Sequence, residues 1–375
     1  MSSLIVRPVQ SAGDRKRFLE FPWQLYRGNP HWIPPLRREQ AELAGYRRHP
    51  FYRRNEAQTF LALRGEKVCG RIAAIHNRDY LDYQKDARGF FGFFECEDDA
   101  GAARALLEVA REWLAKRGLH ALRGPINPSI NYSAGVLIEG FDSPPTFLLP
   151  YNRPYYAALL EGCGCRKTQD LYAYWGDREM LPAIQAKTDP VADQITERYG
   201  LKIRTLRRWR FRREVGEFLS VFNRSAVSHW SFAPLSPAEV RHLANGLRWL
   251  LVPDMAVAAE IDGKLVGVAL ALPDYNPLIR KIDGRLFPFG FLRLLAGKRK
   301  ITKYRIIAAN VLPEYQLLGL GLVLLRAMVP PARSRGIEEA EFSWVAESNR
   351  LSRGALEKGG AKRIKTYRVF DWEPS

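Results

Sequence analysis

The chain has 375 residues, of which 46% are hydrophobic, so it can bury a full core and is long enough for about two domains. Its 58 Lys and Arg against 40 Asp and Glu give a formal net charge of +18, which favours polyanionic partners. Residues 1–15 show no apolar core flanked by a cleavage site, and we find no run of about 18 apolar residues and no zinc-finger, RNA-binding or basic-zipper spacing. We therefore expect a cytoplasmic chain that does not span a membrane, and nucleic acid is not the favoured partner.

Cysteine usage excludes a disulfide framework. The four cysteines, Cys69, Cys96, Cys163 and Cys165, are too few and too irregularly spaced for one in a chain of this size. Cys163 and Cys165 form a short metal-binding pattern, but no second pair or nearby histidine accompanies it. We predict reduced structural thiols and no bound metal.

The first half alternates strand-like and helix-like segments, which is typical of α/β or α+β architecture. Its order is strand, helix, three strands, helix and strand, at residues 4–9, 14–26, 57–63, 67–76, 89–96, 100–116 and 120–123.

Two irregular stretches interrupt this pattern. Residues 21–36 are rich in proline and aromatic residues, and we interpret them either as a surface loop or as the wall of a pocket. The long loop from Gly124 to Pro145 contains Asn127, Asn131 and Tyr132, which are candidate substrate contacts. Residues of these types also cap turns, which is the structural alternative.

The second half starts after a connector. Residues 179–200 contain Pro182 and Pro190 with a helix between them. From Leu201 a strongly basic strand is expected, and two helices follow at 215–228 and 237–250. Segments 256–260 and 265–272 then predict a hairpin around Asp262-Gly263.

Residues 276–303 are an insertion with an unusual composition. Aromatic residues and leucines stand beside a basic cluster, and residues 276–305 contain nine basic residues and one acidic residue, Asp283. This composition suits an anionic bilayer surface or a groove for an acyl chain. The structural alternative is an amphipathic helix packed on its own domain.

An internal repeat indicates duplication. Residues 158–167 and the aromatic strand 171–175 resemble residues 355–363 and the aromatic strand 367–372. Each copy has a helix that ends at glycine, then basic residues, then a strand. We interpret the chain as two tandem copies of one fold.

A glycine-bearing turn in the second copy is the central motif. The apolar segment 304–311 predicts a buried strand, and Gln316, Gly319 and Gly321 follow it before an apolar helix at 320–328. The first N–H groups of a helix lack intrahelical partners, and glycine lets a phosphate approach them. An ordinary strand-to-helix turn is the alternative.

Gln316-Leu-Leu-Gly319-Leu-Gly321 resembles the Gln/Arg-x-x-Gly-x-Gly/Ala signature of the GNAT superfamily of acyltransferases. Downstream, Asn349 and the run from Leu356 to Lys362 resemble the Asn…Tyr-Glu-Lys-x-Gly-Phe block of that family. The resemblance implies two tandem GNAT folds, with mixed central sheets flanked by helices, and acyl-CoA as co-substrate without a metal. It assigns these residues to the coenzyme: Val311, Leu312, Gln316, Leu317, Leu318, Gly319, Leu320, Gly321 and Asn349.

The proton-transfer groups of the family are not recognisable. In GNAT enzymes an amine attacks the thioester, N–H donors on a strand bulge stabilise the oxyanion, and a tyrosine often protonates the thiolate. Here that position is Leu356, and no carboxylate follows Ile307 on the strand. A thiol pKa of about 8.5 makes thiolate a fair leaving group without an acid. The unranked candidates for the base are Asp274, His229, His31 and Glu139.

We therefore predict three parts of the chain: a degenerate GNAT-like domain at 1–178, a connector at 179–200 and a coenzyme-binding domain at 201–375. In the first domain the acidic run 95–99 replaces the coenzyme turn.

The chain also resembles a bacterial group of double-domain GNAT-like proteins that lies near proposed bacterial ceramide synthases. The resulting hypothesis is an N-acyltransferase that acylates an amine, including a lipid amine such as a sphingoid base, with peripheral association at the inner membrane face through 276–303. The alternatives are a catalytically idle scaffold that binds a membrane or a partner, and an acetyltransferase for a small polar amine.

Overall fold

The computed structural model describes residues 3–226 and 230–374. The chain forms two compact units. Unit 1 comprises residues 1–171, 276–294 and 365–375, and unit 2 comprises residues 172–275 and 295–364. Each unit contains a mixed sheet flanked by helices, so the predicted α/β class is confirmed. The predicted insertion 276–303 is divided between the two units after residue 294.

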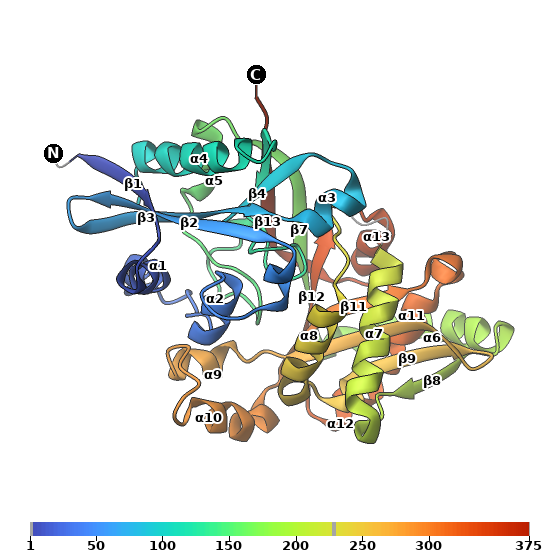
Figure 1. Ribbon diagram of the computed structural model, residues 1–375. Coiled ribbons are helices and arrows are strands. Elements are labelled where there is room, and N and C mark those ends of the chain that lie inside the picture. The colour runs from blue at the N-terminus through green and yellow to red at the C-terminus, as the bar shows by residue number, and fades with distance from the viewer. Residues whose placement is uncertain (1–2, 227–229, 375) are drawn as a thin grey trace. The chain divides into compact units, whose positions relative to one another are not determined.

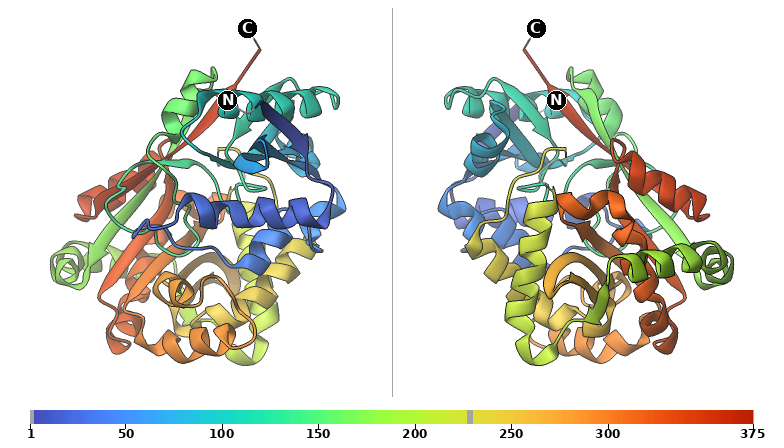
Figure 2. Two further views of the ribbon diagram at one scale, coloured as in Figure 1. Left: turned by 90° about the vertical axis from the view of Figure 1, so that its left-hand side faces the viewer. Right: turned by 90° about the vertical axis from the view of Figure 1, so that its right-hand side faces the viewer.

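The sheet of unit 1 is antiparallel except for one parallel pair. Its strand order is β1-β2-β3-β4-β5-β13, in which only β4 and β5 run parallel, and β6 pairs with β13. Helices α1 and α4 cover opposite faces of β1–β4, as Figures 1 and 2 show. Leucines and alanines at helical spacing on α4 are fully buried against β2, β3 and β4. The strands are β1 (Leu4–Pro8), β2 (Glu56–Arg64), β3 (Lys67–His76), β4 (Arg88–Cys96), β5 (Ala121–Gly124), β6 (Val136–Glu139) and β13 (Lys362–Trp372).

Unit 2 repeats this topology. Its strand order is β12-β11-β10-β9-β8, and only β11 and β12 run parallel. Helix α7 packs on β10 and β11 from one side, while α6 and α11 lie on the other side (Figure 2, right). The strands are β8 (Lys202–Thr205), β9 (Ala256–Ile261), β10 (Lys264–Pro273), β11 (Lys303–Val311) and β12 (Glu339–Ala346), and β7 (Arg166–Asp177) contributes residues to both units.

The helices complete both units. In unit 1 they are α1 (Ala12–Leu25), α2 (Arg37–Leu43), α3 (Arg78–Gln84), α4 (Ala100–Ala115), α5 (Tyr156–Gly162) and α9 (Asn276–Lys281). In unit 2 they are α6 (Leu181–Arg198), α7 (Phe211–Ser225), α8 (Pro237–Leu250), α11 (Leu320–Ala327), α12 (Val329–Ser334) and α13 (Arg350–Lys358), and α10 (Gly290–Gly297) begins in unit 1 and ends in unit 2. Short 3₁₀ segments are η1 (Pro50–Arg53), η2 (Arg178–Met180), η3 (Arg208–Arg210), η5 (Pro253–Met255), η6 (Lys298–Lys300) and η7 (Pro313–Leu318).

The internal repeat has the same turn in both copies. After α5, Gly164 has φ of 84° and donates to Glu161 O, and the next residue donates to Leu160 O. After α13, Gly360 has φ of 86° and donates to Glu357 O, and the next residue donates to Leu356 O. Glycine suits this position because the left-handed conformation penalises a Cβ atom.

Three local predictions differ from the structure. The basic stretch after Thr205 is not a strand, because η3 and then α7 begin there and the α7 side chains Val215 and Phe218 are buried at helical spacing. Residues 21–25, where the predicted helix 14–26 and the predicted irregular stretch 21–36 overlap, are the last turn of α1, so the helix prediction holds there and the irregular stretch begins only after Leu25. The connector holds one helix, α6, which continues through Pro190.

Within the described part of the chain, no helix is both long and apolar enough to cross a bilayer. All four cysteines are free thiols. No group of three or more His, Cys, Asp or Glu residues among those described could hold a metal ion.

Candidate functional site

The predicted coenzyme turn lies in unit 2 between β11 and α11 (Figure 1). After Leu312 the chain forms η7, and Gly319 then begins α11 with φ of 78°. Leu320, Val323 and Leu324 are buried against the sheet, which fixes the direction of α11. The sequence pattern of strand, glycine turn and helix therefore has the predicted local structure.

The N-terminus of α11 is open at the positions where a phosphate would bind. No side chain caps it. A Cβ atom added at Gly321 would meet no atom within 4 Å, and Leu317 is 85% exposed. Because the first N–H groups of a helix lack intrahelical acceptors and carry the positive end of the helix dipole, this turn is suited to a pyrophosphate.

A polar network that sequence reasoning missed holds the turn in place. Gln316 Nε2 donates to Val311 O at 3.1 Å and to Ser225 O at 3.2 Å. Asn310 Nδ2 donates to Ser225 Oγ at 2.9 Å, and both of these side chains are buried. Asn310, a lone amide in an apolar strand directly before the turn, was the available signal. Gln316 thus connects the turn to the end of β11 and to the end of α7.

We expect Gln316→Leu to bind CoA about tenfold more weakly, because each lost bond contributes about 1 kcal/mol to the turn geometry. Calorimetry with CoA measures this effect. Gln58→Leu is the matched control, since Gln58 on β2 of unit 1 donates one bond to the Thr59 carbonyl. Equal affinity of Gln316→Leu and wild type would contradict the role of Gln316 in holding the turn.

Strand β11 has the bulge that the resemblance implies. Its pairing with β10 shifts between Ala308, opposite Leu270, and Ile306, opposite Ala271, so Ile307 is the extra residue. The parallel pairing of β11 with β12 covers only four residue pairs and ends at Ile306 and Phe342. Beyond Ile306, the main-chain groups of β11 on the side of β12 are not paired with that strand, and this part of β11 leads into the coenzyme turn.

The equivalent place in unit 1 is filled by its own loop. Strand β4 also has a register shift, and Phe93 there has φ of 50°. The Asn127 side chain accepts the Phe93 N–H, and the Ile126 N–H donates to Phe91 O at 2.8 Å. A Cβ atom at Gly92 would lie 2.0 Å from Ile126 O. Asn127, a predicted substrate contact, therefore accepts a hydrogen bond from a main-chain N–H group of its own unit.

The helix that corresponds to α11 in unit 1 is capped. Asp99 accepts the Ala102 N–H at 3.0 Å and pairs with Arg64 at 2.6 Å. Burial opposes ionisation of Asp99, but the bonds from Ala102 and Arg64 outweigh it and lower the pKa of this carboxyl. Nearby, the partly buried Glu95 accepts hydrogen bonds from Tyr26 at 2.6 Å and Tyr156 at 2.7 Å. At the N-terminus of α4 a pyrophosphate would meet the Asp99 carboxylate, whereas no side chain caps the N-terminus of α11.

The second family signature forms α13 and its cap. Asn349 Oδ1 accepts the Ser352 N–H at 3.1 Å, so its side chain is used for helix capping. Leu356 packs against Tyr172, Tyr174 and Val345. The Tyr174 hydroxyl donates to Glu357 Oε1 at 2.6 Å, and burial together with this bond raises the pKa of Tyr174. Tyr174 thus brings a phenol from β7 against the helix that lacks the family tyrosine, and sequence reasoning did not single it out.

A buried charged network lies where β11 and β12 separate, and it was also missed. Arg305 Nε donates to Ser343 Oγ at 2.8 Å, and Ser343 Oγ donates to Glu341 Oε1 at 2.8 Å. Arg305 and Glu341 are opposite each other in the strand register and are 5% and 0% exposed. The sequence signal for this network was the alternation of polar residues at Glu339, Glu341 and Ser343 along β12.

The candidate bases are distributed over both units. Asp274 is buried directly after β10 in unit 2, where its N–H donates to Lys303 O. His31 and Glu139 belong to unit 1, and Glu139 accepts a hydrogen bond from Thr366. His229 lies outside the described residues. The structure places none of these candidates on the coenzyme turn itself.

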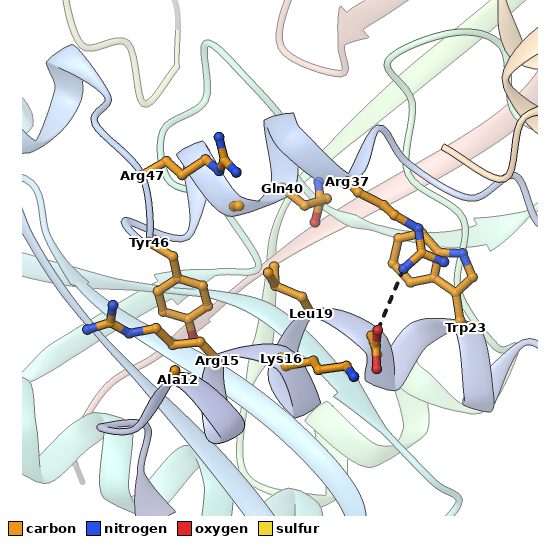
Figure 3. A pocket seen from close by; sticks show the side chains of 11 residues that line it. Ala12, Arg15, Lys16, Leu19, Trp23, Arg37, Gln40, Tyr46 and Arg47 are labelled. Atoms are coloured by element: carbon orange, nitrogen blue, oxygen red, sulfur yellow. Dashed lines mark ion pairs between the residues drawn. The ribbon is translucent and has the colours of Figure 1, made fainter. Parts of the chain in front are cut away.

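The remaining predicted substrate residues lie in the loop after β5. Asn131 N donates to Ser129 Oγ, and the Tyr132 ring packs edge-on against His49 at 5.2 Å. A separate surface pocket of about 350 Å³ lies between α1 and α2 of unit 1 (Figure 3). It is lined by basic side chains, and Arg37 stacks over the Trp23 ring at 4.1 Å. The stretch 21–36 therefore contributes Trp23 to the wall of this pocket, and Arg37 follows directly after it.

Comparison with known proteins agrees with this geometry. Residues 221–360 match the model of the Acetyltransferase (GNAT) family. Protein YghO of Escherichia coli strain K12 is 34% identical over 377 residues, which cover 98% of this chain and 95% of that protein. The protein named bacterial ceramide synthase of Caulobacter vibrioides is 33% identical over 380 residues, which cover 99% of this chain and 97% of that protein.

Solved structures share the fold at low sequence identity. A tandem GNAT protein from the clavulanic acid biosynthesis pathway has a TM-score of 0.56 and 16% identity, with 100% of both chains covered. A GCN5-related N-acetyltransferase from Sphaerobacter thermophilus has a TM-score of 0.53 and 13% identity, with 99% of this chain and 95% of that chain covered. The chain therefore belongs to the GNAT acyltransferase family and has the tandem GNAT fold that its two sequence signatures predicted.

Proposed function

We propose that the protein transfers an acyl group from acyl-CoA to an amine at unit 2. The observation that carries this proposal is the uncapped N-terminus of α11 beside the bulged strand β11. The N–H groups after Gly319 bind the pyrophosphate, and the thioester extends along the edge of β11 beyond Ile306, where the pairing with β12 has ended. The filled bulge and capped helix of unit 1 support a single coenzyme site per chain.

The chemistry follows from this placement. The deprotonated amine attacks the thioester carbonyl, and main-chain N–H groups near Ile307 stabilise the oxyanion. The C–S bond then breaks, the nitrogen loses one proton as it becomes the amide, and the CoA thiolate takes up one proton, so that the products are the amide and the free thiol. The Tyr174 hydroxyl, which lies on β7 and hydrogen-bonds to Glu357 of α13, is a candidate donor of the thiolate's proton in the absence of the family tyrosine.

We further propose that the acceptor is a lipid amine such as a sphingoid base. The support is the full-length similarity to a protein named bacterial ceramide synthase, together with the apolar and basic composition of residues 276–303. A small polar amine is the alternative acceptor.

Two measurements test the proposal. Calorimetry with acetyl-CoA and palmitoyl-CoA should give one bound coenzyme per chain. Release of the CoA thiol should then require palmitoyl-CoA and sphinganine together, and mass spectrometry should find the corresponding amide. Absence of binding by either coenzyme would overturn the transferase assignment, whereas thiol release with spermidine but not sphinganine would overturn only the lipid acceptor.

A further inference from the structure

We infer that residues 285–300, the docking stretch, attach the protein to the surface of an anionic lipid bilayer. The stretch comprises the loop before α10, α10 itself and the basic turn η6. This inference does not rest on the proposed acyl transfer, because it concerns a surface that the coenzyme turn does not use.

The N-terminal base of the docking stretch is held firmly in unit 1. Asp283 accepts hydrogen bonds from Trp23 Nε1 and from Arg37, each at 2.7 Å. The Arg37 N–H donates to Gly284 O at 3.0 Å, and a Cβ atom at Gly284 would lie 2.1 Å from Pro35 O. These contacts fix the position from which the loop projects.

The tip beyond this base exposes large apolar side chains. Phe287 is 69% exposed, Phe289 is 68% exposed and Leu292 is 59% exposed. No other window of six residues in the described chain contains three exposed large apolar side chains. Leaving such groups in water is unfavourable by about 1.5–3 kcal/mol for each residue relative to full burial, so this cluster marks an interaction surface.

The charge of the docking stretch selects the kind of surface. Residues 285–300 contain five basic residues and no acidic residue. Arg285, Arg293, Arg299 and Lys300 are all exposed. Apolar side chains flanked by basic ones match the acyl boundary and the phosphates of an anionic bilayer. A second copy of the same stretch would instead bring like charges together.

The C-terminal end of the stretch, residues 295–300, belongs to unit 2 and contacts basic and aromatic groups of that unit. Lys298 Nζ donates to Leu251 O at 2.6 Å and to Trp249 O at 3.1 Å, and Trp249 is 48% exposed. Burial and the nearby charges of Arg335 and Arg208 lower the pKa of Lys298 to about 8. Exposed tryptophan beside positive charge is typical of membrane interfaces.

Sedimentation of the full-length protein with vesicles tests the inference. We expect binding to vesicles of phosphatidylcholine mixed with phosphatidylglycerol, and weak binding to phosphatidylcholine alone. Phe287→Ser/Phe289→Ser should reduce the partition coefficient at least about tenfold, because two apolar anchors are removed. Arg299→Gln/Lys300→Gln should reduce it about twentyfold on the anionic vesicles only, at about fivefold for each charge near the surface.

Matched variants separate the docking stretch from general effects. Leu351→Ser removes an apolar side chain that is 71% exposed on α13, and Arg166→Gln/Arg212→Gln removes two exposed arginines elsewhere. Both controls should bind as wild type, and thermal unfolding should show every variant folded. Failure of the wild type to sediment with anionic vesicles, or unchanged binding by Phe287→Ser/Phe289→Ser, would overturn the inference. A wild-type dimer that these two substitutions dissociate would assign the surface to a second copy instead. CoA binding, measured without vesicles, should be unchanged in all of them.

Discussion

A Gly321→Asp variant is expected to bind CoA about a thousandfold more weakly than wild type, or not measurably. The position has space for a side chain, because a Cβ atom there meets nothing within 4 Å, and its φ is not in the left-handed region. The variant should therefore fold. Its carboxylate would lie at the helix N-terminus proposed for the pyrophosphate, where two like charges about 4 Å apart repel by about 4 kcal/mol at an effective dielectric constant of 20. Isothermal calorimetry with CoA measures the loss.

Two further glycine substitutions make this prediction specific. Gly321→Ala adds only a methyl group in open space and should change the affinity less than about threefold, since no contact is lost. Gly319→Ala should instead reduce stability by about 1–2 kcal/mol, because φ at Gly319 is 78° and the new Cβ would lie 2.7 Å from Ile195. CoA binding by Gly321→Asp with wild-type affinity would mean that the coenzyme phosphates bind elsewhere.

Local sequence patterns were sufficient to predict the turn between β11 and α11. A strand that ends at a proline, two glycines and an apolar helix depend on interactions within about 20 residues of the chain. The polar network behind the turn was not predictable in this way. Ser225 lies 91 residues before Gln316, and only the fold brings its carbonyl to the amide.

The degenerate nature of the first copy was predictable only in part. The acidic residues before α4 were visible in the sequence, and Asp99 indeed caps that helix. The sequence did not indicate that the loop after β5 returns to strand β4 and places Asn127 on Phe93, because the two residues are 34 positions apart, with helix α4 and strand β5 between them. The polar residues of this loop were therefore interpreted by their chemistry alone, which fits a substrate contact and a structural cap equally well.

The division of strands between the two units depends on long-range pairing. Phe370 on β13 pairs with Gly124 on β5, although 246 residues separate them. Strand propensity and the internal repeat predicted that β7 and β13 exist, but neither property specifies a partner strand. The predicted domain boundaries at 178 and 200 divide the chain into continuous segments, because they were placed from the internal repeat. The compact units are defined by packing, and unit 1 therefore includes residues 276–294 and 365–375 from the second half of the chain.

Replacing Glu341 with leucine is expected to lower the free energy of unfolding by about 3–5 kcal/mol, because it leaves the charge of Arg305 buried without its counterpart. Glu341 is 0% exposed and Arg305 is 5% exposed, and Ser343 Oγ bridges them with two bonds of 2.8 Å. Lys303 Nζ, at 3.9 Å from Glu341 Oε2, lies nearer to solvent and is expected to contribute less. Urea denaturation followed by tryptophan fluorescence measures the change.

A double-mutant cycle identifies the cause. Arg305→Met/Glu341→Leu should regain most of the stability lost in Glu341→Leu, because the unpaired charge is removed together with its partner. Glu341→Gln keeps a hydrogen-bond acceptor for Ser343, so its free energy of unfolding should lie between those of Glu341→Leu and the double variant. Additive losses in the double variant would show that each side chain acts through packing alone. Arg305 and Glu341 lie next to the last paired residues of β11 and β12. In the proposed site only the thioester end of acyl-CoA depends on how these two strands separate. Glu341→Leu should therefore weaken the binding of acyl-CoA more than the binding of free CoA.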